Sequence, residues 1–363
     1  MEFFGRFGDE YEQIVICHDA VVGLRAIVAI HSTVLGPALG GTRFYPYRSD
    51  DQALEDVLRL ARGMTYKAAA AGLNLGGGKA VILGDPATDK TEGLLRAYGR
   101  FLDTLSGRYI TAEDVGTTQS DMDVIFSQTP SVTGIAPALG GSGDPSAATA
   151  YGLWWAMKAV RHTLDGTDEL ADCRVVVSGV GKVGSRLVAH LVGDGARVTV
   201  ADVDPDAVAQ MVADHGVTPA TAETAHRLEC DIFSPCALGG SLNQTTIPEL
   251  RCRAVAGCAN NQLLTPEDGG RLADRGILYA PDFVVNSGGV INIADELTGY
   301  DQARAYGSVR GIYDTTLKVF AASRQQGVPP DVVAEAMADE RLAKAAAGWS
   351  GVHGFDGTAR RPR

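Results

Sequence analysis

The sequence predicts an α/β fold made of two domains with a cleft between them. A chain of 363 residues is long for a single hydrophobic core. Short apolar strands alternate with helical patterns through the second half, which is typical of a parallel, doubly wound sheet. A stretch rich in Gly, Pro and Ser over residues 136–149 marks the expected hinge. We therefore expect one domain over residues 1–138 and another over residues 139–328.

Two predictions concern the C-terminal region. A helical pattern over residues 329–347 is expected to pack back on the first domain. The polar, Gly-rich residues 348–363 are expected to form a frayed tail.

The first half has a clear order of expected elements. Hydrophobic periodicity and turn residues predict strands at 11–20 and 23–33, a Gly-, Pro- and aromatic-rich loop at 36–47, a helix at 51–71, a strand at 80–83, a helix at 91–106 and a strand at 108–112. A loop of this composition on a rigid scaffold often carries binding residues.

The second half continues the alternation. We expect a helix at 151–163, strands at 174–178, 197–203, 231–234, 254–257 and 277–280, and a long helix at 302–326.

Composition narrows the classes of partner. A net charge of −12 argues against nucleic acid and against an anionic membrane surface. Neither a signal peptide nor a transmembrane stretch is recognisable. The six cysteines lack CxxC spacing, which predicts reduced thiols in a cytoplasmic protein and no metal site.

Two lysines, Lys67 and Lys79, stand twelve residues apart. Lys67 is near the end of the predicted helix, and Gly76, Gly77 and Gly78 are expected to turn the chain before Lys79 opens the next strand. A lysine in an apolar setting loses hydration, so its pKa falls toward the range of a general base. The alternative is that Lys67 extends to solvent over apolar surface and Lys79 faces solvent. The glycine run favours a site, because it indicates a close approach to the backbone.

Asp114 follows the strand predicted at 108–112. Acids at the carboxyl end of an α/β strand lie where ligands usually bind. Asp114 is equally compatible with an N-cap of the next helix.

A dinucleotide fingerprint opens the second half. Gly179, Val180, Gly181, Lys182, Val183 and Gly184 read GxGxxG, follow a strand and begin an apolar-periodic helix. Asp202 ends the following strand and would accept hydrogen bonds from ribose hydroxyls. This context predicts a Rossmann-type domain that binds NAD, because neither Lys nor Arg follows Asp202 closely. The loops at 234–240 and 257–261 should border the same site, and a helix should begin after Asn286.

The chain resembles the glutamate/leucine/phenylalanine/valine dehydrogenase superfamily of amino-acid dehydrogenases, and within it the leucine and valine dehydrogenases. The resemblance is carried by GPALGGTRFYPY, RGMTYKAAAAGLNLGGGKAVILGDP, YITAEDVGTTQSDMD, GVGKVG, PCALGG, ANNQL and GILYAPDFVVNSGGVINIADEL, in the family's order.

The resemblance implies roles for individual residues. Lys67 would bind the substrate α-carboxylate, Lys79 would be the general base, and Asp114 would exchange protons with the reacting amine and water. The further substrate-binding residues implied are Gly40, Gly41, Asn260 and a side-chain pocket of Leu39, Ala112, Val290 and Ile293. The cofactor set implied beyond the fingerprint and Asp202 is Val203, Ala237, Leu238 and Asn260.

The implied reaction is the reversible, NAD-dependent oxidative deamination of a branched-chain L-amino acid to a 2-oxo acid and ammonia. The family forms homo-oligomers, so we expect one here, with the first domain serving substrate binding and oligomerisation. Two alternatives stay open: a phenylalanine- or glutamate-type dehydrogenase on the same scaffold, and an NAD-binding regulatory protein without catalysis. The intact Lys67, Lys79 and Asp114 argue against the second.

Overall fold

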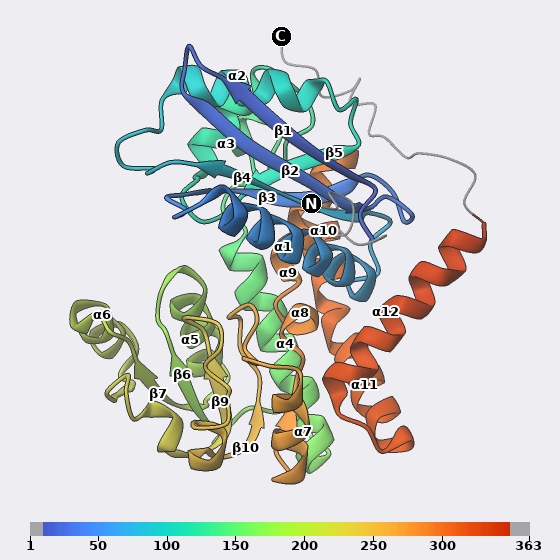
Figure 1. Cartoon of the computed structure of the whole chain (residues 1–363). Helices are drawn as coiled ribbons and strands as arrows, with labels where there is room; N and C mark the ends of the chain where they lie inside the picture. The colour runs from blue at the N-terminus through green and yellow to red at the C-terminus, as the bar shows by residue number, and fades with distance from the viewer. Residues whose placement is uncertain (1–9, 349–363) are drawn as a thin grey trace. The chain divides into compact units, whose positions relative to one another are not determined.

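The computed structural model describes residues 10–348 and divides the chain into two compact units (Figure 1). Unit 1 holds the described residues up to Asp144, Ile293–Gln302 and the described residues from Ala338 onward. Unit 2 holds Pro145–Asn292 and Ala303–Met337. Each unit has its own sheet, as an α/β protein of two domains requires. The functional boundaries expected near residues 138 and 328 stay predictions.

Unit 1 is built on a mixed five-stranded sheet in the order β1-β2-β4-β3-β5. Its strands are β1 (Gln13–Asp19), β2 (Leu24–Ser32), β3 (Ala38–Tyr45), β4 (Gly76–Leu83) and β5 (Tyr109–Glu113). Strand β4 is antiparallel to β2 and parallel to β3, and β3 is parallel to β5. The carboxyl ends of β3 and β5 therefore lie at the same edge of the sheet, which is where a ligand site can form.

Helices cover both faces of this sheet. They are α1 (Asp50–Ala70), α2 (Glu92–Asp103) and α3 (Gln119–Phe126). One apolar cluster lies between α1 and the sheet and contains Ile27, Ala29, Ala53, Val57, Ala61 and Val81. A larger cluster on the opposite face includes residues of α2 and α3, such as Tyr98 and Ile125.

Two sequence predictions in unit 1 are wrong. Residues 38–45 form the inner strand β3, not part of a loop, and Gly76–Gly78 lie inside β4 instead of in a turn. The turn after α1 comes earlier, at Gly72, whose φ is +73°. Adjacent glycines predict a loop or a turn because Gly weakens an isolated strand. Here the same glycines permit close backbone contacts within the sheet. A Cβ on Gly40 would lie 1.8 Å from the carbonyl oxygen of Gly78.

Unit 2 is built on a six-stranded parallel sheet, as the alternating pattern predicts, in the order β11-β10-β9-β6-β7-β8. The strands are β6 (Arg174–Ser178), β7 (Arg197–Ala201), β8 (Thr218–Pro219), β9 (Glu229–Pro235), β10 (Arg251–Val255) and β11 (Leu278–Tyr279).

The remaining helices follow the sequence pattern with one exception. They are α4 (Ser146–Asp165), α5 (Lys182–Gly193), α6 (Pro205–His215), α7 (Glu267–Asp274), α8 (Asp282–Val285), α9 (Gly288–Asp295), α10 (Gln302–Arg310), α11 (Ile312–Gln326) and α12 (Pro330–Ala347). Short 3₁₀ turns occur at Pro137–Leu139, Ala225–Arg227, Ile247–Glu249 and Glu296–Thr298. The single helix expected at 302–326 is instead two helices, because Gly311 interrupts it.

The C-terminal part of α12 contacts α1 within unit 1. Tyr66 Oη donates to Asp339 Oδ1 at 2.7 Å, and Arg341 donates to the backbone oxygen of Ala69 at 2.8 Å. Apart from Gly348, the predicted tail lies outside the described residues. Within residues 10–348, no helix combines the length and apolar character needed to cross a bilayer.

Candidate active site

Close packing of α1 on β4 positions Lys79. A Cβ on Gly77 would lie 2.0 Å from the backbone nitrogen of Thr65, so only glycine allows helix and strand to approach this closely. Side chains alternate along a strand, so Lys79 lies on the same face of the sheet as Gly77 and Val81, toward α1. The glycine run therefore marks a close approach, as the sequence predicts, but the approaching group is the protein's own helix.

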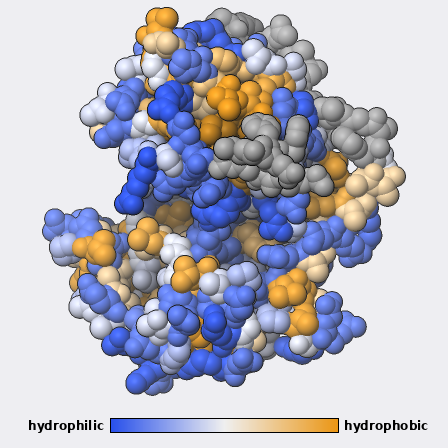
Figure 2. Space-filling model, viewed as in Figure 1, coloured by the Kyte–Doolittle hydropathy of each residue, from blue (hydrophilic) through white to orange (hydrophobic). Residues whose placement is uncertain are grey.

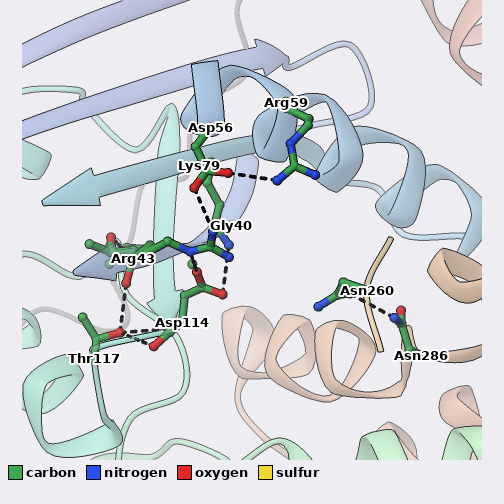
Figure 3. Close-up of polar contacts among 12 residues, drawn as sticks. Gly40, Arg43, Asp56, Arg59, Lys79, Asp114, Thr117, Asn260 and Asn286 are labelled. Atoms are coloured by element: carbon green, nitrogen blue, oxygen red, sulfur yellow. Dashed lines mark hydrogen bonds and ion pairs between the residues drawn. The ribbon is translucent and has the colours of Figure 1, made fainter. Parts of the chain in front are cut away.

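Lys79 forms a largely buried ion pair with Asp114 (Figure 3). Its Nζ lies 3.2 Å from Asp114 Oδ1, and the two side chains are 7% and 21% exposed. A burial this deep is rare for a lysine without a charged partner. The alternative of a solvent-facing Lys79 is wrong.

Arg43 holds the other oxygen of the same carboxylate. Its Nε donates to Asp114 Oδ2 at 2.9 Å, and another guanidinium nitrogen donates to Asp56 Oδ2 at 2.7 Å. Tyr47 Oη and Arg59 also donate to Asp56, at 2.7 and 2.9 Å. Asp114 is thus clamped between two cations, one of which is fixed in turn by a second carboxylate.

The backbone next to Asp114 is also fixed. Its N–H donates to Thr117 Oγ1 at 2.9 Å, and that hydroxyl lies 2.9 Å from the backbone oxygen of Thr42. Helix α3 is capped by Thr118. Asp114 is therefore not an N-cap, which removes the structural alternative considered for it.

Electrostatics keep this carboxylate ionised. Burial by itself raises the pKa of Asp114, but the nearby charges and hydrogen bonds of Lys79 and Arg43 outweigh it and hold that pKa below its usual range. The pKa of Asp56 is lowered as well: burial opposes this, and the hydrogen bond from Tyr47 and the charge of Arg43 overcome it. Burial, followed by the hydrogen bond to Asp56, raises the pKa of the Tyr47 phenol far above its usual value.

Lys67 is in the last turn of α1 and is partly buried. The backbone of Thr65 in α1 lies against Gly77 in β4. Lys67 comes two residues after Thr65, and Lys79 comes two residues after Gly77. The packing contact between helix and strand therefore joins the two segments that carry the lysines.

Arg43, Asp56 and Tyr47 are not among the site residues that the sequence predicts. An available signal was alternation along β3: Gly41 faces Asp114, since a Cβ there would lie 2.9 Å from the Cβ of Asp114. Arg43, two residues later, is on the same face. The Gly- and Pro-rich composition of residues 36–47 predicts a loop, so the alternation that places Arg43 beside Asp114 is not apparent from the sequence.

The four residues of the predicted side-chain pocket are apolar and buried, and the pocket itself stays a prediction. Leu39 and Ala112 are buried in neighbouring strands of unit 1, 0% and 5% exposed. Val290 and Ile293, each 7% exposed, lie on one face of α9. A cavity of about 530 Å³ in unit 1 is a separate feature, because none of these residues lines it. Its lining is Arg43, Tyr45, Tyr47, Gln52, Glu55, Asp56, Arg59 and Val115.

The glycine fingerprint of unit 2 has the geometry that a dinucleotide needs. Gly179 has a φ of +108°, and a Cβ there would lie 2.7 Å from the backbone of Cys236 and Ala237. A Cβ on Gly184 would lie 2.0 Å from the carbonyl oxygen of Gly179. Gly181, at the start of α5, has no atom within 4 Å of its Cβ position, which leaves room for a pyrophosphate at the helix N-terminus.

The predicted acid lies beside the fingerprint loop, and apolar side chains nearby are exposed. Asp202 Oδ2 accepts the Val180 N–H at 2.7 Å, which orients its carboxylate beside the loop. Val203 and Leu238 are 87% and 82% exposed, so two apolar side chains are available to a ligand. The Asn286 amide donates to Asn260 Oδ1 at 3.0 Å. The chemistry of these residues is compatible with a dinucleotide, and the cofactor-binding residues stay predictions.

Figure 2 shows mainly hydrophilic side chains on the face it presents, with apolar residues scattered among them. Within residues 10–348, no cluster of three or more His, Cys, Asp or Glu is arranged to hold a metal ion. The site must be judged on its lysine, carboxylate and glycine geometry.

Fold and site together define a two-domain α/β protein with a Rossmann-like parallel sheet and a buried lysine–carboxylate pair. The family described as Glu/Leu/Phe/Val dehydrogenase, dimerisation domain, matches residues 12–131. The family described as Glutamate/Leucine/Phenylalanine/Valine dehydrogenase matches residues 140–210 and 203–308. The chain belongs to this family of amino-acid dehydrogenases.

Individual relatives are similar along most of the chain. Leucine dehydrogenase of Geobacillus stearothermophilus is 53% identical over 92% of this chain and 91% of its own length. Valine dehydrogenase of Streptomyces coelicolor is 52% identical over 92% of this chain and 93% of its own. The crystal structure of L-tryptophan dehydrogenase from Nostoc punctiforme matches with a TM-score of 0.81 and 41% identity, covering 93% of this chain and 97% of that one.

Proposed function

We propose that the protein catalyses the reversible, NAD-dependent oxidative deamination of branched-chain L-amino acids. The observation that carries this proposal is the buried pair of Lys79 and Asp114, 3.2 Å apart, in a family of amino-acid dehydrogenases. Relatives about half identical to this chain are named leucine dehydrogenase and valine dehydrogenase. The overall reaction converts the amino acid, NAD⁺ and water to the 2-oxo acid, ammonia, NADH and a proton.

Each charged residue has a distinct task in this proposal. Lys67, a cation at the end of α1, binds the substrate α-carboxylate. Bound NAD supplies the chemistry of hydride acceptance from Cα. In its deprotonated form, Lys79 acts as the general base that activates water for attack on the resulting iminium carbon. Asp114 exchanges protons with the amine and the water, and Arg43 fixes its carboxylate in position.

The substrate is further oriented by Gly40, Gly41 and Asn260. Gly40 and Gly41 contribute by their lack of side chains, because a Cβ on Gly41 would lie 2.6 Å from the backbone oxygen of Glu113 and displace the strand end that carries Asp114. A displacement of this kind far exceeds the tolerance of a catalytic geometry.

NAD is the cofactor we propose, held by residues of unit 2. The fingerprint glycines leave the pyrophosphate space at the N-terminus of α5, and Asp202 accepts bonds from the ribose hydroxyls. The exposed loop residues Ala237 and Leu238 border the same site. We also propose a homo-oligomer that works in the cytoplasm, supported by the matched dimerisation domain and by the cysteine pattern.

An absorbance assay at about 340 nm, where reduced nicotinamide absorbs, tests the proposal directly. The purified chain is mixed with NAD⁺ and L-valine, L-leucine, L-isoleucine, L-phenylalanine, L-tryptophan or L-glutamate. Ammonia release and 2-oxo acid formation are measured in parallel. The aliphatic branched-chain amino acids should give the highest kcat/KM. Absence of turnover with every amino acid would contradict the proposal and favour the non-catalytic alternative.

A second candidate is a dehydrogenase for a larger, aromatic amino acid. It is favoured by the 41% identity to the L-tryptophan dehydrogenase of Nostoc punctiforme. A glutamate-type enzyme is less well supported, because all four residues of the predicted pocket are apolar and leave a side-chain carboxylate unpaired.

A further inference from the structure

Two pairs of cysteines lie along β9 and β10 and the loops that follow these strands. Cys252 is directly opposite Cys230 in the register of the parallel strands. Beyond the strand ends the register shifts by one residue, because the Ala259 N–H donates to the backbone oxygen of Pro235 at 3.0 Å. Cys258 nevertheless stays close to Cys236, and its Sγ lies 3.9 Å from the Cys236 carbonyl oxygen.

The two pairs differ in access and in chemistry. Cys230 and Cys252 are buried, 2% and 9% exposed, while Cys236 and Cys258 are only partly buried. Burial raises the pKa of the Cys252 thiol to about 12 and that of Cys230 further. In contrast, the neighbouring thiol of Cys258 lowers the pKa of Cys236, against the effect of burial and with help from Ser234, whose Oγ lies 3.3 Å from its sulfur. Thiolate character and access are what make a cysteine reactive.

Cys236 is in direct contact with the glycine fingerprint. Its N–H donates to the Ser178 oxygen at 2.7 Å, at the end of the strand that leads into the loop. A Cβ on Gly179 would lie 2.7 Å from the Cys236 carbonyl carbon, and one on Gly184 would lie 3.5 Å from the Cys236 Cβ. The carbonyl oxygen of Cys258 accepts from the Asn286 amide at 3.2 Å. A covalent change at this pair is thus transmitted at once to both sides of the proposed cofactor site.

We propose that Cys236 and Cys258 form a thiol-modification site that reacts with low-molecular-weight disulfides and closes to an intramolecular disulfide, and that this disulfide weakens cofactor binding. The two residues follow adjacent parallel strands, and the Cys258 sulfur already lies 3.9 Å from the Cys236 carbonyl oxygen. This proximity is what a disulfide requires of its two cysteines. The second part rests on the proposed function, whereas bond formation does not.

The reaction has two exchange steps. The Cys236 thiolate attacks one sulfur of the small disulfide, forms a mixed disulfide and expels one small thiolate, which takes up a proton. The Cys258 thiolate then attacks the Cys236 sulfur and expels the second small thiol. The two cysteines lose two electrons and two protons, and the small disulfide gains both, so one protein disulfide and two small thiols result.

Bridge formation is tested by counting thiols. The full chain is incubated with oxidised glutathione, denatured, alkylated and mapped by mass spectrometry. Of the six cysteines, four should stay alkylatable and one peptide pair should link Cys236 to Cys258. Dithiothreitol should restore all six. C258S should stop at a mixed disulfide on Cys236, whereas C252S should form the same bridge as the wild type. A full set of six thiols, or a bridge through another cysteine, would overturn the proposed site.

The effect on the cofactor is tested by binding as well as by rate. The Kd for NADH, followed by its fluorescence, should rise at least tenfold in the bridged wild type and return after reduction. C258S treated with diamide at a level that bridges the wild type should keep its starting Kd once small thiols are removed by size exclusion. An unchanged Kd in a protein that carries the mapped bridge would overturn the proposed control of the cofactor site. Mapped bridging in a protein that lacks dehydrogenase activity would instead count against the proposed function alone.

Discussion

Lys79 Nζ and Asp114 Oδ1 lie 3.2 Å apart on segments of one sheet that flank β3, with Arg43 of β3 on the other carboxylate oxygen at 2.9 Å. The three side chains come from β4, from the residue after β5 and from β3. Because Arg43 occupies Oδ2, the carboxylate cannot rotate freely, and Oδ1 stays directed at Lys79. Such a fixed contact between a lysine and a carboxylate suits proton exchange with a substrate placed beside them.

The first prediction concerns the charge of Asp114. D114N keeps the side-chain shape but leaves Lys79 and Arg43 without their shared carboxylate. We expect kcat to fall about 10²–10⁴-fold, as for loss of an acid–base group. We also expect the free energy of unfolding to fall by about 3 kcal/mol, because two partly buried cations lose their partner. Steady-state kinetics and urea unfolding measure the two effects.

A matched control separates these effects. Asp121 is also largely buried and lies 2.7 Å from Lys90, outside the predicted site. D121N should lower the free energy of unfolding. It should leave kcat within about twofold of the wild type, because Asp114 is intact and keeps its contribution to the rate. Equal losses of kcat in both variants would show that Asp114 acts only through stability.

The second prediction distinguishes the two lysines. K79A should lower kcat about 10²–10⁴-fold with nearly unchanged NAD affinity, because it removes the general base. K67A should act mainly through the KM of the amino acid, with a smaller effect on kcat from misorientation. Both are compared with K90A in the same assay. Near-normal turnover by K79A would refute its proposed role.

The third prediction is a loss of stability in acid. The pKa values of Asp56 and Asp114 are lowered in the folded protein, so their stabilisation is fully present above the unfolded pKa of about 3.9 and is lost as pH falls through the folded values. The free energy of unfolding should therefore decrease when the pH is lowered below about 4. D56N should be less stable than the wild type near neutrality, and the difference should shrink in acid. Parallel curves for the two proteins would contradict the assignment.

The fourth prediction is a preference for NAD over NADP. Asp202 accepts the Val180 N–H at 2.7 Å and the Asp204 N–H at 3.0 Å, so its carboxylate is held at the loop. Asp204 and Asp206 follow, and neither Lys nor Arg stands nearby in the sequence to accept a 2′-phosphate. Comparing kcat/KM for the two cofactors checks this. Equal or better use of NADP would require another cation to reach the site.

Sequence patterns predicted unit 2 better than unit 1, for a physical reason. The fingerprint and the parallel strands depend on local signals, such as the apolar run 174–178, which matches β6 residue for residue. In unit 1, β3 and the start of β4 contain adjacent glycines whose purpose is visible only in the packed sheet, where Gly77 meets Thr65. The same long-range packing hid Arg43 and Asp56 from the sequence. The sequence predicts Lys79 and Asp114 because each lies in its own continuous family motif. Their contact joins separate strands and is visible only in the structure.

The last prediction concerns side-chain specificity, placed at valine, leucine and isoleucine. Ala112 is 5% exposed and lies opposite Gly41 in the sheet, two residues before Asp114. Its methyl group therefore limits space on the side of the reacting carbon. Leu39, fully buried in the neighbouring strand, contributes an apolar wall without a cation for glutamate.

Removing that methyl group tests the pocket. A112G should raise kcat/KM for phenylalanine relative to valine, because the aromatic ring gains room while the small side chain loses contact. One methylene group in an apolar pocket is worth about 1–3 kcal/mol, so the ratio should move by about 10–200-fold, and valine, leucine and isoleucine should overlap in the wild type. The matched control is A26G, a substitution of the same size at a buried alanine of β2 in the same sheet. If A112G leaves the ratio unchanged, Ala112 is ordinary core; if glutamate or phenylalanine is the best substrate of the wild type, the pocket lies elsewhere.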